Sequence, residues 1–567
     1  MNILGISPLS SANPASALLK DGKLVAFAEE ERFNRIKHSP SHFPFLSAFY
    51  CLKEAGLKKE DIDYVAVGGE NHYQILEELI ELKDFKRFIS AQYDDKDEAA
   101  INSESLFRYL PYGRAESHND HLTHEYTGRF FNVTSNKIEW LSHHLSHVAS
   151  SCIPSNFSSC NFMSLDGLGG ALSGVIGFFN GKNFEIYDKF FINESLGAYY
   201  SVITETLGFH RHGGEGKTMG LASYGKVDEN TLPFYAKRSG AFNEFKLDAI
   251  KYNKWANSSC LPPPTDDNIL SPPYVDRAAT CQHYFEKMII DHARHLHEKT
   301  GNKNFAVAGG SFLNCSANGK LLEQDFVDNL FIQPASHDAG VALGAAILTH
   351  HRYMGEFPKA DFSTAYWGSS FDDYEVLATL QDFPDLTYEN INPSETIPTL
   401  LHEDKVIGYM AGKAEIGPRA LCHRSILANP TNKDNLNRVN KIKGREFWRP
   451  LAPTMTAESL HDIVHIKHAS PFMLMAAQVK KEWKDKIPAV VHVDGSCRPQ
   501  SVNSSQNPII HKALLNFEKK SGAPVFLNTS FNLDGEPLVD SPKDALKTFL
   551  NSNLNFLIIE NILIKRK

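Results

Sequence analysis

The opening of the chain alternates apolar runs with turns. Residues 2–7 form an apolar run, and 15–20 and 23–29 are two strand-like runs separated by Asp21-Gly22. This dipeptide favours the positive φ angles of a tight two-residue turn. The pattern therefore predicts that the chain opens as a β-hairpin.

Helical and strand patterns then follow one another. Residues 45–57 have the spacing of an amphipathic helix that ends near Gly56, and 63–69 are typical of a buried strand. Residues 137–141 predict a further strand, which precedes a short helix starting near His143. This alternation indicates an α/β fold.

A second hairpin of similar design is predicted near residues 160–190. Strand patterns at 161–166 and 171–179 flank the glycine-rich turn 167–170. Because this arrangement resembles the first hairpin, we infer a duplicated α/β core.

The middle of the chain predicts a loop, a long helix and a domain boundary. The stretch 257–275 is rich in Pro, Ser and Asp, which favours a surface loop or lid. Residues 276–300 predict a long helix, 305–308 a strand and 339–354 another helix. A polar, turn-rich segment follows, so we expect a domain boundary near 355–375.

Composition and charge exclude several classes of protein. Hydrophobic residues make up 42% and charged residues 22% of the 567 positions, which is typical of a chain with a sizeable core and not of disorder or a coiled coil. The formal net charge of −9 disfavours nucleic acid and anionic membranes as partners. The 8 cysteines form no CxxC pair, and no run approaches the ~18 apolar residues of a membrane span. We therefore expect a soluble, unprocessed protein of the reducing cytoplasm.

Two histidines and two aspartates form a candidate metal site. His143 and His147 are four positions apart, which places both imidazoles on one helical face with the spacing a metal needs. Chance alone gives about one such pair among 25 histidines, so a packed or surface pair is the alternative. Asp166 and Asp338 add carboxylates in suitable contexts. This donor set suits iron, manganese or zinc.

Three glycine-rich loops are candidates for binding an anion or a nucleotide. They are 166–170, 213–217 with Lys217, and 309–314 with Gly309, Gly310 and Asn314. Glycine lets backbone N–H groups converge on an anion, and a helix N-terminus after a strand can face phosphate. An ordinary hairpin turn is the alternative for the first loop.

The C-terminal part carries cations and amides. Residues 413–455 contain few acids among their arginines and lysines. Guanidinium groups held in a pocket suit bidentate capture of phosphate, whereas a solvated charged face is the alternative. Further polar positions near 492–500 and 525–532 are also candidates for ligand binding, and the alternative is that they form turns or cap helices. The candidates are Arg419, Lys443, Arg449, Arg498, Asn528 and Ser530.

Ten ordered motifs carry a resemblance to a known family. They are EEERFNRIKH at 29–38, HHLSHVAS at 143–150, SLDGLGG at 164–170, EGKTMGLASYG at 215–225, GGSFLNCSANGKL at 309–321, PASHDAGVALGAA at 334–346, EIGPRALCHRSILANP at 415–430, REFWRPLAP at 445–453, HVDGSCRPQ at 492–500 and LNTSFNLDGEPLV at 527–539. On these motifs the chain resembles the ATP-dependent O-carbamoyltransferases of the nodulation-factor, cephamycin and tobramycin type, over nearly its full length.

The resemblance implies two domains. Residues 1–360 would form an α/β domain with a duplicated actin-like-ATPase fold, similar to the tRNA threonylcarbamoyladenosine enzymes. Residues 361–567 would form a smaller α+β domain, similar to their YrdC-like partner, which forms a carbamoyl-adenylate.

The resemblance also implies a reaction in two steps. The C-terminal site would convert carbamoyl phosphate and ATP to carbamoyl-AMP. The intermediate would pass internally to the N-terminal site, where a hydroxyl of a small-molecule or glycan acceptor receives the carbamoyl group. The implied cofactors are ATP and a divalent metal, with iron ahead of magnesium, manganese or zinc.

Particular residues receive roles from this resemblance. The metal would be held by His143, His147 and Asp338, with Asp166 nearby. Gly309, Gly310 and Asn314 would contact the nucleoside, and Lys37 would face the N-terminal reaction centre. Carbamoyl phosphate and the adenylate would be bound by Arg419, Lys443, Arg449, Asn528 and Ser530, with Arg498 and Lys217 as further nucleotide-binding cations.

One position departs from the family pattern. The family usually has His-Asp-Ala-Ser after the first strand, whereas this chain has Asn13-Pro14-Ala15-Ser16. Asparagine cannot accept a proton near neutral pH, so the base that the family histidine would provide is missing. Three explanations stay open: metal activation alone suffices, the acceptor is a better nucleophile, or another group such as His38 substitutes. Transfer to an amine and a non-catalytic nucleotide-binding role stay open as alternatives.

Two further expectations concern partners. A tRNA-modifying fusion protein is disfavoured because the chain is acidic and has no basic arm. The acceptor pocket would be shaped by regions 70–130 and 257–275, which are least like the family.

Overall fold

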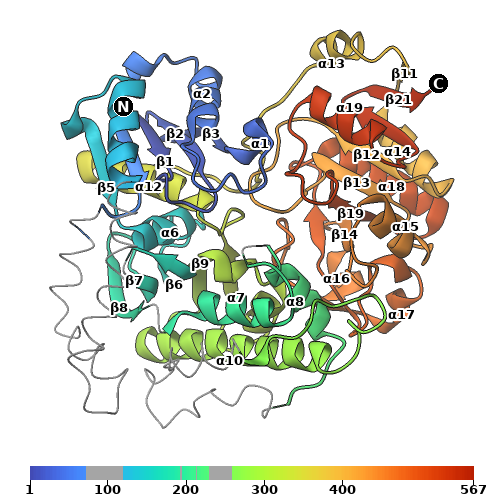
Figure 1. The fold of residues 1–567 in the computed structure, drawn as a ribbon, viewed down its shortest axis with the longest axis horizontal. Helices are drawn as coiled ribbons and strands as arrows, with labels where there is room; N and C mark the ends of the chain where they lie inside the picture. Colours follow the sequence, from blue (N-terminus) through green and yellow to red (C-terminus); the bar gives the residue numbers. More distant parts are fainter. Residues whose placement is uncertain (72–73, 75–118, 171, 192–193, 212, 229–257) are drawn as a thin grey trace.

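The computed structural model describes most of the chain in two halves (Figure 1). The described residues are all except 72–73, 75–118, 171, 192–193, 212 and 229–257. Most of the region 70–130, which was expected to shape an acceptor pocket, therefore lies outside the described residues. In Figure 1 the elements up to α12 occupy the left half and those from α13 onward the right half.

The first sheet contains the predicted hairpin. Its strands are β1 (Asn2–Ile6), β2 (Ala15–Lys20), β3 (Lys23–Glu29), β4 (Tyr64–Gly68) and β5 (Ile138–Leu141), in the order β3-β2-β1-β4-β5. β1 pairs antiparallel with β2 and parallel with β4. At the turn, Asp21 and Gly22 have φ angles of 50° and 70°, as the dipeptide predicts.

The second sheet repeats this arrangement. Its strands are β6 (Cys160–Gly169), β7 (Leu172–Phe179), β8 (Phe184–Phe191), β9 (Asn304–Ala308) and β10 (Asn329–Ile332), in the order β10-β9-β6-β7-β8. β6 pairs antiparallel with β7 and parallel with β9, so both sheets have the same strand order and pairing. The predicted turn at 167–170 was placed too early, because β6 continues to Gly169 after a shift of register beyond Leu165.

Two helices lie between the sheets. α12 (Ala339–Met354) packs on the first sheet, α6 (His143–Cys152) packs on the second, and the two helices pack on each other. Glycine permits the closest approaches: a Cβ built on Gly5 would lie 1.9 Å from the Ala342 carbonyl oxygen, and one on Gly344 would lie 1.7 Å from the Ser146 carbonyl oxygen. This tight contact fixes the position of both helices between the two sheets.

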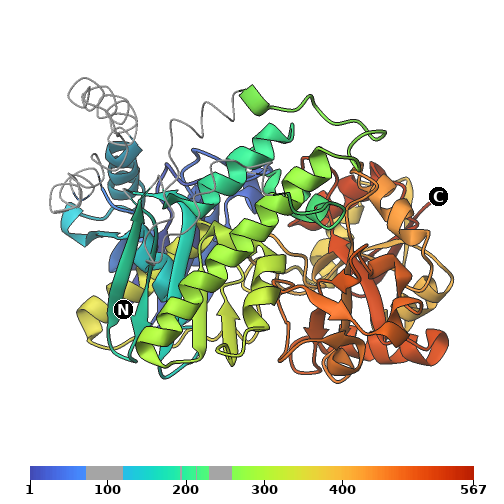
Figure 2. The same ribbon diagram turned by 90° about the horizontal axis from the view of Figure 1, so that it is seen from below.

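Further helices cover the outer faces of these sheets. α1 (Glu31–Asn34) and α2 (Phe45–Glu54) pack on the first sheet, and α7 (Leu196–Thr206) and α10 (Tyr274–Thr300) pack on the second. α8 (Glu215–Ala222) and α11 (Cys315–Leu322) pack on α10. α10 begins two residues before its predicted start, and Figure 2 shows it crossing one face from the second sheet toward the C-terminal half.

The C-terminal half is built on one large mixed sheet. Its strands run in the order β11-β21-β20-β12-β13-β19-β14-β18, and a three-stranded sheet β15-β16-β17 lies beside it. The strands are β11 (Leu386–Asn390), β12 (Ile407–Met410), β13 (Arg424–Ala428), β14 (Ala452–Thr456), β15 (Val464–His465), β16 (Ala477–Val479), β17 (Ser496–Cys497), β18 (Gln500–Val502), β19 (Val525–Ser530), β20 (Phe556–Ile559) and β21 (Ile562–Arg566). The helices are α13 (Asp373–Leu380), α14 (Pro393–His402), α15 (Asn435–Ile442), α16 (Leu460–Ile463), α17 (Lys481–Lys484), α18 (Pro508–Ser521) and α19 (Pro542–Leu550). The whole chain is therefore a mixed α/β protein.

The link between the halves stays against the first sheet before it leaves. The Lys359 N–H donates to the Gly22 carbonyl at 2.9 Å, and the Tyr50 hydroxyl donates to the Trp367 carbonyl at 3.0 Å.

Among the described helices, none has the length and apolar character to cross a membrane. The boundary at 360/361 stays a prediction.

The close contact of α12 with α6 yields a stability prediction. We expect Gly344→Ala to lower the free energy of unfolding by about 1–3 kcal/mol, because the new methyl group overlaps the Ser146 backbone. Thermal melting should show a lower Tm. Gly216→Ala is the matched control, since nothing lies within 4 Å of its added Cβ. Equal Tm values for the two variants would contradict the packing described.

Candidate metal centre and anion site

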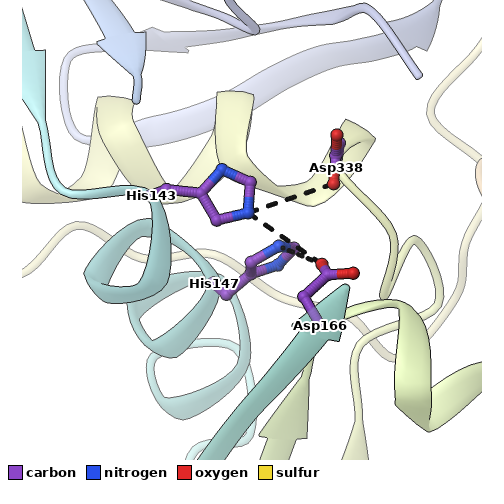
Figure 3. Close-up of side chains that lie close together, drawn as sticks. All are labelled: His143, His147, Asp166 and Asp338. Atoms are coloured by element: carbon purple, nitrogen blue, oxygen red, sulfur yellow. Dashed lines mark ion pairs between the residues drawn. The ribbon is translucent and has the colours of Figure 1, made fainter. Parts of the chain in front are cut away.

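Four side chains converge where the two sheets meet (Figure 3). α6 contributes His143 and His147, β6 contributes Asp166, and Asp338 stands at the start of α12. One ligand atom of each residue lies within 4.8 Å of the others. Asp166 Oδ2 is 3.2 Å from His147 Nε2 and 3.9 Å from His143 Nε2, which is 4.0 Å from Asp338 Oδ1. The structure thus brings together all four residues that the sequence suggested.

The donor atoms of this cluster lack ordinary partners. Within the described residues, His143 Nε2, His147 Nε2 and Asp166 Oδ2 are buried and make no well-aligned hydrogen bond. Buried polar atoms without hydrogen bonds are costly, and a cation coordinated by them removes that cost. Two imidazoles and two carboxylates therefore fit a divalent metal.

Electrostatics within the cluster also favour a cation. Burial disfavours a charge on His143, but Asp166, Asp338 and Glu70 outweigh it and raise the pKa of His143 to about 9. Burial lowers the pKa of His147. The two imidazoles outweigh burial at Asp166 and hold its pKa well below the usual range. A metal ion can take the place of the proton that His143 holds.

Neighbouring groups orient the ligands. Asp338 Oδ2 accepts hydrogen bonds from Ser11 Oγ at 3.2 Å and from the Ala12 N–H at 3.1 Å. The Glu70 carboxylate accepts from the His143 N–H at 3.0 Å. A Cβ on Gly169 would lie 2.1 Å from the His143 ring, so glycine is required for the ring to occupy this position.

The predicted nucleoside loop adjoins the cluster. Gly309 has φ 96° and lies against Leu165, and a Cβ on Gly310 would lie 3.0 Å from Asp166 Oδ1. Asn314, in contrast, caps α11 and exchanges two hydrogen bonds with Gln282, at 2.9 and 3.0 Å. Its amide is therefore committed to the fold.

A second cluster lies in the C-terminal half around a buried lysine. Lys443 Nζ donates to the carbonyl oxygen and hydroxyl of Ser530 at 2.5 and 3.1 Å, and to the carbonyl and side-chain oxygens of Asn532, both at 2.8 Å. Burial, together with the charges of Arg445 and Arg449, lowers the pKa of Lys443 well below its usual range. The ammonium group is thus fixed in a strongly positive environment.

Arginines concentrate positive charge around this lysine. Burial and the charges of Arg498 and Arg449 lower the pKa of Arg419 to about 9. The pKa values of Arg445 and Arg449 are also lowered, by burial first and by neighbouring arginines next, with Glu446 opposing the shift. Such mutual repulsion is relieved by a bound anion, and guanidinium groups pair well with phosphate oxygens.

Two other predicted ligands lie at the edges of this cluster. Lys217 Nζ is 2.5 Å from the Glu446 carboxylate, which joins α8 to the arginine-rich segment. The Asn528 amide is fully buried and donates to Thr454 Oγ1 at 2.9 Å and to Gln500 Oε1 at 3.2 Å. Asn528 therefore supports the sheet through its amide N–H groups, while within the described residues its Oδ1 is buried without a hydrogen bond.

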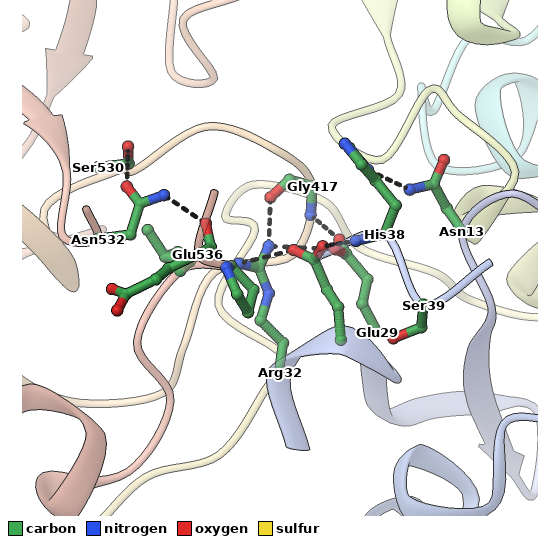
Figure 4. Close-up of polar contacts among 12 residues, drawn as sticks. Asn13, Glu29, Arg32, His38, Ser39, Gly417, Ser530, Asn532 and Glu536 are labelled. Carbon is green, nitrogen blue, oxygen red and sulfur yellow. Dashed lines mark hydrogen bonds and ion pairs between the residues drawn. The ribbon is translucent and has the colours of Figure 1, made fainter. Parts of the chain in front are cut away.

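The segment 29–38 joins the two halves. Arg32 donates to Glu29 at 3.1 Å and to the Gly417 carbonyl at 2.8 Å, while the Gly417 N–H donates back to Glu29 at 2.6 Å. Arg35 donates to the Leu538 carbonyl at 2.5 Å. Figure 4 shows the contacts of Arg32, Glu29 and Gly417 between Asn13 and His38 on one side and Ser530 and Asn532 on the other.

Two family models match the chain over most of its length. The model described as carbamoyltransferase N-terminus matches residues 2–347, and the model described as carbamoyltransferase C-terminus matches residues 398–566. The chain belongs to the carbamoyltransferase family. The family predicted from the ten motifs is therefore confirmed.

Full-length relatives agree with this membership. An uncharacterized protein of Synechocystis sp. is 32% identical and aligns with 100% of this carbamoyltransferase and 97% of the relative. The nodulation protein NolNO of Sinorhizobium fredii is 32% identical over 98% of this chain and 79% of its own. Nodulation protein U of Rhizobium tropici is 26% identical over 94% of this chain and 91% of its own.

The sequence did not reveal several residues that shape this carbamoyltransferase. Ser11 holds Asp338, Asn532 holds Lys443, and Arg32 links the halves. The motif EEERFNRIKH was a signal for the last of these, but only Lys37 was singled out from it. Lys37 is exposed, and its charge lowers the pKa values of Glu31 and Lys443.

The geometry of the metal centre yields a binding prediction. We expect His147→Ala to reduce the metal content of the purified carbamoyltransferase at least about tenfold, because it removes one of the convergent donors. Elemental analysis after loading with iron, manganese or zinc measures this. His144→Gln is the control, since His144 Nδ1 instead contacts Ser164 Oγ at 2.9 Å. Undiminished metal in His147→Ala would contradict the assignment.

Proposed function

We propose that this carbamoyltransferase forms carbamoyl-AMP from carbamoyl phosphate and ATP in its C-terminal half, and transfers the carbamoyl group to a hydroxyl of a small molecule or glycan in its N-terminal half. The buried Lys443 among four arginines carries the first part of this proposal, because a site of such positive charge is suited to two phosphorylated substrates. Family membership supports the second part.

The C-terminal site can stabilise the charge that develops during adenylation. Formation of carbamoyl-AMP from carbamoyl phosphate, ATP and water releases inorganic phosphate and pyrophosphate, whose negative charges must be neutralised as they leave. The oxygens of Ser530 and Asn532 hold the Lys443 ammonium group in one position, so little reorganisation is needed when a phosphate arrives. Arg419 and Arg449 supply planar donors for two phosphate oxygens at once.

The N-terminal site supplies the place for transfer. His143, His147, Asp166 and Asp338 would hold a divalent metal, for which iron is our first choice. When bound there, a divalent cation supplies positive charge for the AMP leaving group and for the acceptor oxygen. A mixed carbamoyl-phosphate anhydride is lost easily to water, which favours having both sites within one chain.

We also propose the finer fold assignment. The two sheets with one shared strand order support a duplicated actin-like-ATPase domain over 1–360, and the large mixed sheet supports a YrdC-like domain over 361–567. The net charge of −9 favours small-molecule substrates over tRNA. The eight free cysteines, none in a CxxC pair, favour a reducing cytoplasmic location.

Substitution of the buried lysine tests the proposed adenylation. With ATP, carbamoyl phosphate and a divalent metal but no acceptor, we expect Lys443→Ala to lower pyrophosphate release and carbamoyl-AMP formation at least about 100-fold, because a positioned cation is lost. A coupled pyrophosphate assay and mass spectrometry measure the two products. Lys441→Ala, two residues away and exposed, should match the wild type. Product formation by Lys443→Ala at the wild-type rate would refute the assignment of this site.

A further inference from the structure

The segment that follows α1 is held in an uncommon conformation. Arg35, His38, Ser39 and Ser41 have φ angles of 62°, 64°, 47° and 59°. Such left-handed conformations cost on the order of 1 kcal/mol for residues other than glycine, and they persist only where the surroundings enforce them. At His38 the enforcement is a hydrogen bond of 2.6 Å from its N–H to the buried Glu31 carboxylate.

The His38 ring is directed at the loop that carries Asn13 (Figure 4). Asn13 Nδ2 and His38 Nδ1 are 3.0 Å apart. The same loop is tied to the metal centre, because the Asn13 N–H donates to Ser11 Oγ at 3.2 Å and Ser11 Oγ donates to Asp338 Oδ2 at 3.2 Å. The imidazole is therefore positioned through Asn13 relative to Asp338.

The other ring nitrogen is available to a ligand. Within the described residues His38 Nε2 makes no hydrogen bond, and it faces Gly213, where an added Cβ would lie 4.0 Å away. The glycine leaves space beside Nε2 that a side chain would fill. A ligand that occupies the space beside Gly213 can therefore contact this nitrogen.

We propose that His38 is the catalytic base of the transfer step and that Asn13 orients its ring. This inference rests on the proposed function. His38 Nε2 takes the proton of the acceptor hydroxyl while the acceptor oxygen bonds to the carbamoyl carbon. The bond from that carbon to the AMP phosphate oxygen breaks, AMP leaves with the electron pair, and the imidazolium then returns its proton to solvent.

The asparagine amide can match the tautomer that this role needs. With Oδ1 toward the ring, Asn13 accepts the Nδ1 proton and the Nε2 lone pair is free. Rotation by 180° about the Cβ–Cγ bond exchanges Nδ2 for Oδ1 at nearly constant shape. Within the described residues Asn13 Oδ1 makes no hydrogen bond that opposes this rotation.

The charges that face His38 favour the neutral ring. Burial and the charges of Lys37 and His337 lower the pKa of His38, while Glu31 and Glu29 oppose the shift. The ring is consequently unprotonated near neutral pH and can accept a proton.

The first test separates the two half-reactions. With ATP, carbamoyl phosphate and a divalent metal, a burst of pyrophosphate reports carbamoyl-AMP formation, and AMP release with water or glycerol as the acceptor reports transfer. We expect His38→Gln to keep the burst and to slow AMP and carbamoyl-glycerol formation at least about 100-fold. His42→Gln, exposed in the same segment, serves as the control and should match the wild type.

A second variant tests the pair through its pH dependence. Asn13→Asp places a carboxylate beside Nδ1, which stabilises the imidazolium and raises the pKa of His38. His38 can act as a base only when it is unprotonated. The acid limb of the pH–rate profile for AMP release should therefore move to higher pH, by about one unit or more. A purely structural role of Asn13 would alter the rate without moving this limb.

The outcomes distinguish this inference from the function on which it rests. Transfer by His38→Gln within about threefold of the wild type, against the expected general-base effect, would overturn it. An acid limb that does not move in Asn13→Asp would also overturn the role of His38. A wild-type burst with no AMP release to water or glycerol would overturn it as well, because a base at this position also activates water. Absence of the burst in the wild type would instead remove the proposed function, and the role of His38 with it.

Discussion

The buried pairing of Arg32 with Glu29 and the Gly417 backbone holds the two halves of the molecule in one arrangement. The side chains of Arg32 and Glu29 are only 5% and 4% exposed, and Arg32 also lies 3.4 Å from the buried Glu31, so these buried charges compensate one another. Gly417 uses both its N–H and its carbonyl in this contact, which leaves the two halves little freedom to slide. Removal of Arg32 would leave the buried Glu29 and Glu31 carboxylates without this cation, which makes the contact specific.

The same segment passes from one chemical site to the other. Arg35 binds the loop that follows Ser530, and three residues later His38 meets Asn13 beside the metal centre. On the opposite side, Arg419 donates to the Leu313 carbonyl at 2.9 Å, next to the loop with Gly309 and Gly310. The metal-site residues and the Lys443 cluster are therefore held in place by shared contacts. Each half of the chain contributes residues to the surroundings of the site in the other half.

The features predicted correctly from the sequence are those set by interactions between residues close together in the chain. The hairpin at Asp21-Gly22 and the bounds of α12 follow from turn preference and apolar spacing, and both are confirmed. The histidine spacing suggested a metal site, but the approach of Asp338 to His143 depends on the tertiary packing of α12 on α6. The contact of Arg32 with Gly417 spans 385 residues and leaves no periodic signal. For Asn314 and Asn528, an amide suits a ligand or the fold equally. The packing shows that Asn314 caps α11, whereas the binding role of Asn528 stays a prediction.

The shared topology of the two sheets places the four metal-site residues on elements that follow or belong to different sheets. His143 and His147 begin the helix after the last strand of the first sheet, and Asp338 begins the helix after the last strand of the second. Asp166 lies three residues before the end of β6, the first strand of the second sheet, whereas Ser7 directly follows β1, the first strand of the first sheet. Any rotation of one sheet against the other changes the separation of these ligands. A cation held by these four residues would therefore link the two sheets, and its affinity would be coupled to their relative placement.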